Sequence, residues 1–178
     1  MNTIDLVKCL NNSPTTKHYF KGVFPCNHLP VKILKPGFVI ANTDVASKSG
    51  THWVSFYFPK KGPAEYFDSF GVSPVFNKHF LKFLQQNCSS YITNTKRLQG
   101  DFSTTCGHYC CVYSYYRCNG KHMKDFVKKF SKKDFNMNDN KIINMYMKCF
   151  DSNFKKKTKF QYGGLFICNQ TCKSKIKK

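Results

Sequence analysis

Acidic residues are scarce in this sequence. Nine Asp and Glu residues stand against 29 Lys and Arg residues, which gives a formal charge of +20, and only Arg97 and Arg117 are arginines. So large an excess of one sign costs self-repulsion, and it is typical of proteins that bind nucleic acid or another polyanion. A charge kept for solubility alone is the alternative. An AT-biased genome could supply lysine codons, but it would not remove the acids.

Long apolar runs are also absent. No stretch approaches 18 uncharged apolar residues, so the sequence predicts no membrane-spanning helix. The opening MNTIDLVKCL carries Asp5 and has neither the basic region nor the apolar stretch of a secretory signal. We therefore expect the ten cysteines to be thiols of an intracellular protein and not a secreted disulfide framework.

The cysteine spacing does not suit a metal. The sequence has no Cys-x-x-Cys, and its nearest approaches are Cys106-x-x-x-Cys110, with His108 inside it, and Cys168-x-x-x-Cys172. Zinc sites usually need pairs of ligands at closer, regular spacing. We therefore expect no metal site.

The remaining patterns predict one α+β domain over residues 1–178, with a lysine-rich segment from about residue 153. Apolar residues make up 41% of the 178 residues, enough for a single core. β-branched and aromatic runs predict strands over 38–42, 52–58 and 64–68, with a weaker strand over 90–98. Helical spacing predicts helices after Thr3 as N-cap, from Ser73 to about Gln86, over 106–116, and over 123–130 and 140–150. Helices would pack on a central sheet, and the Pro- and Gly-containing stretch that follows the first helix, up to Gly37, would form loops and turns.

Cys106 is the cysteine best placed for chemistry. It lies at the start of a predicted helix, where unpaired N–H groups and the helix dipole favour a negative sulfur. Gly107 follows it and would leave room for a substrate backbone. Cys110 and Cys111 lie one turn further along, and we expect them to be buried, inert thiols like Cys118 behind them. Alone, Cys106 would more often be core filler as well.

Three other residues change that assessment. His52 precedes a predicted strand and Asp68 ends the next, so antiparallel pairing would bring the imidazole and the carboxylate together. Gln99, seven residues before Cys106, can offer an amide donor to an oxyanion. Each has an ordinary alternative: a hydrogen-bonded core histidine, a turn aspartate and a solvated loop glutamine. Together with a thiol they indicate nucleophilic catalysis.

The order His-Trp, Asp, Gln, Cys-Gly resembles the adenovirus-type cysteine proteases, the adenain family, including related proteases of virus-like mobile elements. The deSUMOylating proteases share the chain order more distantly. The resemblance covers YFKGVFP, FVIANTDVASKSGTHWVSFYF, EYFDSFG and LQGDFSTTCGHYCCVY. It implies an adenain-like cysteine protease fold, in which a mixed sheet is flanked by helices.

The resemblance also implies the role of each residue. Cys106 would be the nucleophile, His52 the general base and then acid, and Asp68 the residue that orients His52. Gln99 and the Cys106 N–H would form the oxyanion hole. Adenain has Glu where this chain has Asp68, whereas the deSUMOylating relatives have Asp.

Substrates and partners follow from the same resemblance. It implies cleavage after small residues, typically Gly, in viral capsid and core precursors during virion maturation, with viral DNA and a short peptide as activators. It implies a monomer in the virion and the host nucleus, with no metallic or organic cofactor and no membrane partner. The spacing of Cys88 from Gln99 resembles that of the adenain cysteine that forms a disulfide with the activating peptide. A helix-end cysteine with no partner is the alternative for Cys88.

Lysines at regular spacing support the DNA partner independently. Spacing of four on a helix would make one basic face, and lysine without arginine suits phosphate contacts better than base reading. A merely solvated face is the alternative. The candidate DNA-binding residues are Lys124, Lys128, Lys129, Lys132 and Lys133, with a second cluster at Lys155, Lys156 and Lys157.

Three rival functions share these features. The same chemistry could sever ubiquitin or SUMO conjugates after Gly-Gly, or transfer an acyl group to Ser, Thr or Lys. A non-catalytic DNA-binding packaging protein that has kept a protease fold is a rival of another class. It predicts no selective reactivity at Cys106.

Overall fold

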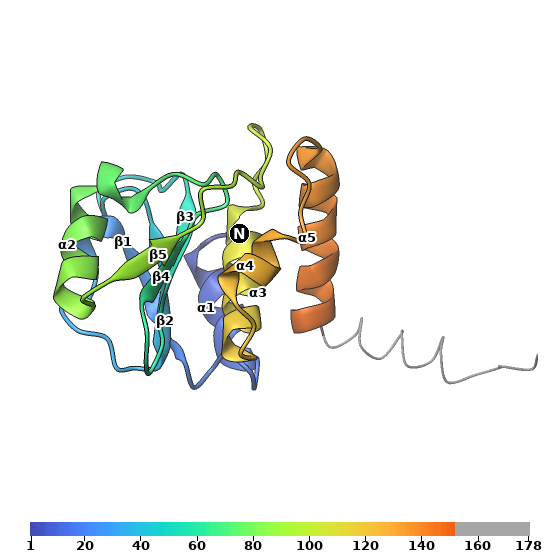
Figure 1. Ribbon diagram of the computed structural model, residues 1–178. Coiled ribbons are helices and arrows are strands. Elements are labelled where there is room, and N and C mark those ends of the chain that lie inside the picture. The colour runs from blue at the N-terminus through green and yellow to red at the C-terminus, as the bar shows by residue number, and fades with distance from the viewer. Residues whose placement is uncertain (152–178) are drawn as a thin grey trace, which may run out of the picture.

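A five-stranded mixed sheet forms the centre of the computed structural model, which describes residues 1–151. Its strands lie side by side in chain order (Figure 1). The pairs β2–β3 and β3–β4 are antiparallel, whereas β1 and β5 are parallel to their neighbours at the two edges. The strands are β1 (Phe20–Pro25), β2 (Gly37–Asn42), β3 (Trp53–Phe58), β4 (Ala64–Phe67) and β5 (Tyr91–Thr93).

Helices cover both faces of this sheet. One face carries α2 (Lys78–Asn87), and the other carries α1 (Thr3–Asn12) and α3 (Cys106–Cys118), with α4 (Met123–Val127) and α5 (Phe135–Phe150) packed outside α3 (Figure 1). Two short 3-10 turns, η1 (Cys26–His28) and η2 (Pro74–Phe76), join the elements. This arrangement confirms the predicted α+β class with helices on a central mixed sheet.

The central strand β3 is buried on both sides. Phe56 packs edge-to-face on Phe83 of α2, with ring centroids 5.2 Å apart. Tyr57 faces the opposite way, into a cluster with residues of α1 and α3. Ser55 and Ser114 bring β3 and α3 together, with their hydroxyl oxygens 3.0 Å apart. The strand that follows His52 is therefore held from both faces, and α3 lies directly against it.

One predicted loop is a strand. Residues 20–25 pair in parallel with β2, although the residues up to Gly37 had been expected to form loops and turns. The pairing shifts register between Phe20 and Val23, and Gly22 lies there at φ 128°. An irregular edge strand that contains a glycine and ends in proline lacks the alternating pattern by which strands are recognised.

The helix boundaries also differ in places. Asn2 caps α1 in a capping box with Asp5, so Thr3 is the first helical residue and not the cap. Ser73 caps only η2, and Asn77 starts α2. The predicted helix 123–130 ends at Val127, where α4 gives way to a turn.

The described residues include neither a candidate membrane-spanning helix nor a candidate metal cluster. Within residues 1–151, none of the helices combines the length and apolar character that crossing a bilayer needs. Over the same range, no group of three or more His, Cys, Asp or Glu side chains is arranged to hold a metal ion. The predicted lysine-rich segment from about residue 153 lies outside the described residues.

Candidate active site

The ends of β3 and β4 bring His52 and Asp68 together. His52 directly precedes β3 and Asp68 directly follows β4, and the register pairs Ser55 with Phe67. The His52 Nε2 lies 2.7 Å from the Asp68 Oδ1, with both side chains largely withdrawn from solvent. Antiparallel pairing thus produces the imidazole–carboxylate contact that the two motifs predicted.

Asp68 is held in place by its surroundings. Its Oδ1 also accepts a hydrogen bond from the Phe70 N–H at 2.8 Å, and only 2% of the residue is exposed. Asn94 accepts from the Asp68 N–H at 3.0 Å and donates to the Asp68 carbonyl at 2.7 Å. The Tyr66 hydroxyl also contacts the carboxylate. A carboxylate fixed in this way can fix the orientation of the imidazole.

Cys106 opens helix α3 and lies against the same imidazole. Burial acts to raise the pKa of the Cys106 thiol. This effect is outweighed by a hydrogen bond to His52, by the charge of His52, and by the backbone N–H groups of Trp53 and Gly107, so the pKa is lowered. Burial likewise acts to lower the pKa of His52, and contacts with Asp68 and Cys106 outweigh it and raise that pKa to about 9. Both shifts favour a thiolate–imidazolium pair.

Gly107 does not leave open space for a substrate. A side chain placed there would meet Met1 at 3.0 Å, so the chain's own residue fills that position. The Met1 carbonyl also accepts a hydrogen bond from the Trp53 indole at 3.1 Å. The absence of a side chain at Gly107 therefore lets Met1 pack closely against the first turn of α3.

Gln99 is buried beside this group, with 1% exposure, and is not the solvated loop residue of the alternative interpretation. Its Oε1 accepts from the Ser69 hydroxyl at 2.6 Å, and its Nε2 donates to the Ser103 carbonyl at 2.6 Å. An amide nitrogen carries two hydrogens, so it can also donate to a ligand. Ser69 follows Asp68 in the chain, and it therefore ties the amide to the strand end that carries the carboxylate.

The other thiols of α3 differ sharply from Cys106. Cys110 and Cys111 are fully buried, and burial raises the pKa of each well above its usual value. Burial also raises the pKa of Cys118, to about 12. Within α3, only Cys106 combines a contact to a base with a lowered pKa. The four cysteines of α3 are free thiols.

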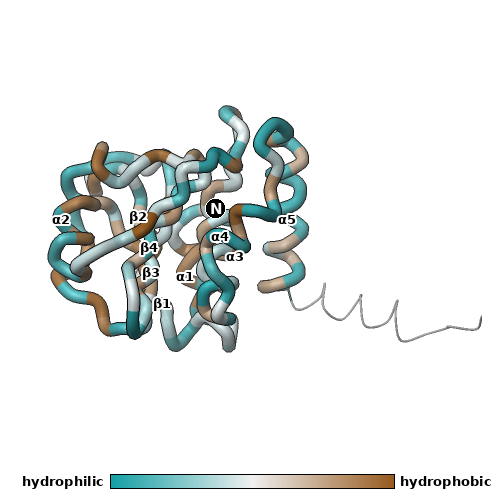
Figure 2. The backbone as a smooth tube through the Cα atoms, viewed as in Figure 1, coloured by the Kyte–Doolittle hydropathy of each residue, from teal (hydrophilic) through white to brown (hydrophobic). Residues whose placement is uncertain are grey.

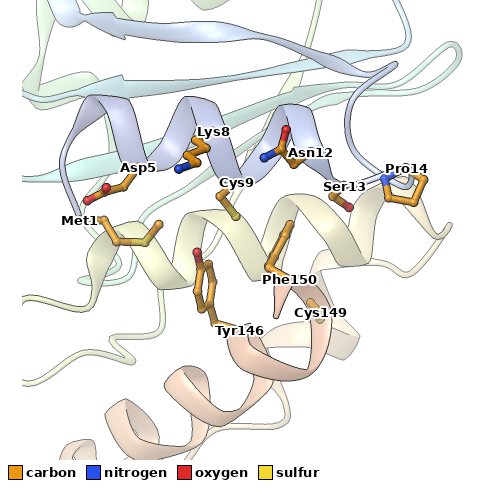
Figure 3. Close-up of a pocket in the computed structure, with 10 residues that line it drawn as sticks. All are labelled: Met1, Asp5, Lys8, Cys9, Asn12, Ser13, Pro14, Tyr146, Cys149 and Phe150. Atoms are coloured by element: carbon orange, nitrogen blue, oxygen red, sulfur yellow. The ribbon is translucent and has the colours of Figure 1, made fainter. Parts of the chain in front are cut away.

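Cys9 also has a lowered thiol pKa. Its contacts with Cys111 and Tyr146 lower that pKa, while burial acts against them. It lines a cavity of about 450 Å³ between α1 and α5, and Figure 3 shows its side chain between the two helices, near Tyr146 and Phe150. None of His52, Asp68, Gln99 or Cys106 lines this cavity.

A groove beside Trp53 lies nearer the candidate site. It has a volume of about 380 Å³ and is lined by Trp53, Asn42 and Asp44, among others. A second groove, of about 550 Å³, lies between the loop after Gln99 and the start of α5. Neither groove is lined by His52, Asp68, Gln99 or Cys106 themselves.

Cys88 and the candidate DNA-binding lysines lie outside this group. Cys88 caps the end of α2, half-buried, with its thiol donating to the Leu84 carbonyl at 3.1 Å, and burial raises its pKa. Lys124 is on α4, Lys128 is its C-cap, and the next three lysines lie in the turn that follows, so the predicted helical face is wrong. All five are exposed: Lys124, Lys128, Lys129, Lys132 and Lys133. Lys155, Lys156 and Lys157 lie outside the described residues.

Sequence reasoning missed the supporting residues Ser69, Asn94 and Asp139. Asn94 meets Asp68 across 26 positions of sequence, and Asp139 meets Gly100 across 39. Only Ser69, next to Asp68 in FDSFG, carried a local signal. Asn94 lies in the middle of the weaker predicted strand and Asp139 just before a predicted helix, and neither position carried a signal for its contact.

Comparison with known proteins finds viral relatives. A protein named Protease from Human adenovirus A serotype 12 is 30% identical over 100 residues, covering 44% of this chain and 48% of the relative. The Protease of Bovine adenovirus 2 is 28% identical over 128 residues (61% and 57%), and that of Frog adenovirus 1 is 27% identical over 109 residues (53% of each). The chain thus spans about half the length of the curated relatives it matches.

No family model matches the sequence. The central domain of an uncharacterized Legionella pneumophila protein aligns with 90% of this chain and 96% of its own, but at a TM-score of 0.43 and 14% identity.

Proposed function

This chain is related to the adenovirus proteases, and on that premise we propose that it is a cysteine endopeptidase of virion maturation that cleaves capsid and core precursor proteins after small residues, typically Gly. The observation that carries the proposal is the contact series Asp68–His52–Cys106, with its 2.7 Å imidazole–carboxylate contact and its lowered thiol pKa. The site of action would be the virion and the host nucleus.

The reaction would begin with the thiolate. The Cys106 sulfur attacks the carbonyl carbon of the scissile peptide bond, and the negative charge passes to the carbonyl oxygen. The Gln99 amide and the Cys106 N–H donate hydrogen bonds to that oxygen. His52 gives its proton to the leaving amine, and the carbon–nitrogen bond breaks to leave a thioester.

Water completes the cycle. His52, now neutral, takes a proton from a water molecule, which attacks the thioester carbonyl. The acid product leaves, and the thiolate–imidazolium pair is restored. Asp68 keeps the imidazole oriented through both steps and stabilises its positive charge.

A comparison of substrates tests the proposal against its rivals. A fluorogenic peptide with Gly at the cleavage position should be hydrolysed, and ubiquitin and SUMO derivatives should be poorer substrates at the same concentration. Preference for the conjugates would favour the deconjugating enzyme. Release of the acyl group onto Ser, Thr or Lys acceptors would favour the transferase. Binding of DNA with no cleavage of any substrate would favour the packaging protein.

DNA is the proposed macromolecular partner, bound without sequence preference. Lys132, which follows α4, supports this idea, because its charge acts on a neighbouring ammonium group. Burial of the Lys96 ammonium and then the charge of Lys132 lower the pKa of Lys96, whose Nζ donates to the Val127 carbonyl at 3.4 Å. A phosphate beside Lys96 and Lys132 would relieve that repulsion.

A short activating peptide is the second proposed partner, linked through a disulfide to Cys88. The half-buried thiol at the end of α2 is accessible in part, which a mixed disulfide requires. If the disulfide forms, intact mass of enzyme from particles should exceed the chain mass by one peptide, and reduction should remove it. A Cys88 that alkylates fully in such material would rule the link out.

A further inference from the structure

The loop between Gln99 and Cys106 has few apolar contacts of its own. It carries Phe102 at its tip with the ring fully exposed, and Asp101 and Ser103 beside it are exposed or half-exposed. Yet the loop joins Gln99, the proposed oxyanion donor, to Cys106, the proposed nucleophile. Something outside the loop must therefore fix its shape.

The start of α5 provides that constraint. Figure 1 places the N-terminal end of α5 beside this loop, and Figure 2 shows that this end of the helix is hydrophilic. One oxygen of Asp139 accepts from the Gly100 N–H at 3.1 Å, and the other accepts from the Thr105 hydroxyl at 2.8 Å. A single carboxylate thus joins the first and last residues of the 100–105 loop.

The contacts continue from Asp139 to the amide of Gln99. The Thr105 hydroxyl oxygen lies 2.7 Å from the Ser103 hydroxyl, and the Ser103 carbonyl accepts from the Gln99 Nε2 at 2.6 Å. Asn138, the neighbour of Asp139, donates to the Leu98 carbonyl at 2.9 Å from the other side of Gln99. The backbone on both sides of the oxyanion donor is therefore held by α5.

Asp139 also determines what the Thr105 hydroxyl does. Thr105 is the N-cap residue of α3, a position where a threonine hydroxyl normally accepts from the N–H groups of the first turn. Here its side chain makes no such cap. The hydroxyl is committed to Asp139 instead, so it does not compete with an oxyanion for the N–H groups at the start of α3.

We propose that Asp139 is a positioning residue that assembles the oxyanion hole by joining Gly100 to Thr105 and keeping the Thr105 hydroxyl away from the first turn of α3. This inference rests on the proposed function. Gly100 suits the role, because a side chain there would press on the Asp139 carboxylate at 3.1 Å. Small displacements of such donors cost about 10²-fold in rate.

Two reactions of Cys106 distinguish this positioning role from a general disruption of the active site. Peptide hydrolysis passes through an oxyanion, whereas alkylation by iodoacetamide needs only the thiolate. Asp139→Ala should lower kcat/KM for a Gly peptide by about 10- to 10²-fold, because it displaces a donor whose complete removal costs about 10²- to 10³-fold. The same substitution should weaken the binding of a peptide aldehyde inhibitor, which forms a tetrahedral adduct with the thiol, by a similar factor. The alkylation rate of Cys106 should change less than about twofold.

Matched variants complete the design. Asp134→Ala removes the N-cap carboxylate of the same helix, which accepts from the Met137 N–H at 2.8 Å within α5, so hydrolysis should be unchanged. Thr105→Val replaces the hydroxyl that donates to Asp139 with a methyl group. It should reproduce the loss of hydrolysis without a loss of alkylation. It also serves if Asp139→Ala does not fold.

The outcomes distinguish this inference from the proposed function. Equal losses of hydrolysis and alkylation, or full hydrolysis in both Asp139→Ala and Thr105→Val, would overturn the positioning role. A wild-type chain that hydrolyses no peptide, even in the presence of DNA and particle proteins, would instead overturn the function. Amide hydrogen exchange over residues 100–106 then tests the remaining claim. Faster exchange in Asp139→Ala supports the joined loop, and unchanged exchange refutes it.

Discussion

At the scale of single residues, the site depends on two opposite pKa shifts. The Cys106 pKa is lowered while the His52 pKa is raised to about 9, although burial acts against each shift. Contacts therefore outweigh desolvation in both groups. The charged pair exists between the two pKa values, and this interval defines where the enzyme can work.

The pH profile of kcat/KM should follow this interval. As the pH falls below the Cys106 pKa, the thiolate is protonated and the rate drops. As the pH rises through about 9, His52 loses the proton that the leaving amine needs, and the rate drops again. Asp68→Asn removes a contact that raises the His52 pKa, so the alkaline limb should move to lower pH. The plateau should fall by about 10²- to 10⁴-fold.

A charge-matched variant provides the control for that profile. Asp125→Asn removes one negative charge from the exposed surface of α4. It should leave both limbs in place. If the alkaline limb of the Asp68→Asn profile does not move to lower pH, a group other than His52 controls it.

At the scale of elements, the site is assembled from strand ends and a helix start. The sequence predicted β2, β3 and β4, the pairing of the last two and the beginning of α3, because these segments have strong local patterns. It did not predict β1, whose register shift near Gly22 breaks the pattern. Nor could it predict the contacts of Asn94 or Asp139, since these join residues that only the folded chain brings together.

The link between Asp68 and the loop after β5 provides a test at this scale. Asn94→Ala leaves the Asp68 N–H buried without its partner, which should cost about 1–3 kcal/mol in the free energy of unfolding. It should also lower kcat/KM, because the carboxylate loses its fixed position. Denaturant titration and steady-state kinetics measure the two effects.

Asn87→Ala is the matched control for that variant. Asn87 is also a buried amide that holds backbone, accepting from the Ile33 N–H at 2.8 Å and donating to the Val31 carbonyl at 3.1 Å. It lies on α2, on the opposite face of the sheet from α3. A similar loss of stability with normal kcat/KM is expected. Equal kinetic losses in both variants would contradict a specific role for Asn94.

At the scale of the whole molecule, charge is the dominant property. A net charge of +20 lets the chain associate with a polyanion without any shaped pocket. Arg97 is one of only two arginines, and it packs over the rings of Phe70 and Phe135. Phosphate contacts would therefore fall mainly to lysines, as the composition predicted.

Salt dependence tests the DNA-binding surface. Lys132→Ala with Lys133→Ala should weaken binding to duplex DNA of any sequence. If both lysines contact phosphate, the slope of log K against log salt should become shallower by about 1.8, at about 0.9 per contact. The exposed pair Lys60 and Lys61 in the β3–β4 turn is the control. Equal effects of the two pairs would contradict a localised surface.

The central claim, that Cys106 is the nucleophile of a protease, has a direct measurement. A Gly peptide ester is mixed with the enzyme, and the reaction is quenched in acid within the first turnover. The intact mass of the enzyme is then measured, and peptide mapping locates the residue that carries the acyl group. The wild-type chain and Cys110→Ala, which lacks the buried thiol one turn further along α3, should both gain the acyl group on Cys106. Cys106→Ala should gain none and cleave nothing. An acyl group on another residue, or cleavage by Cys106→Ala, would contradict the account.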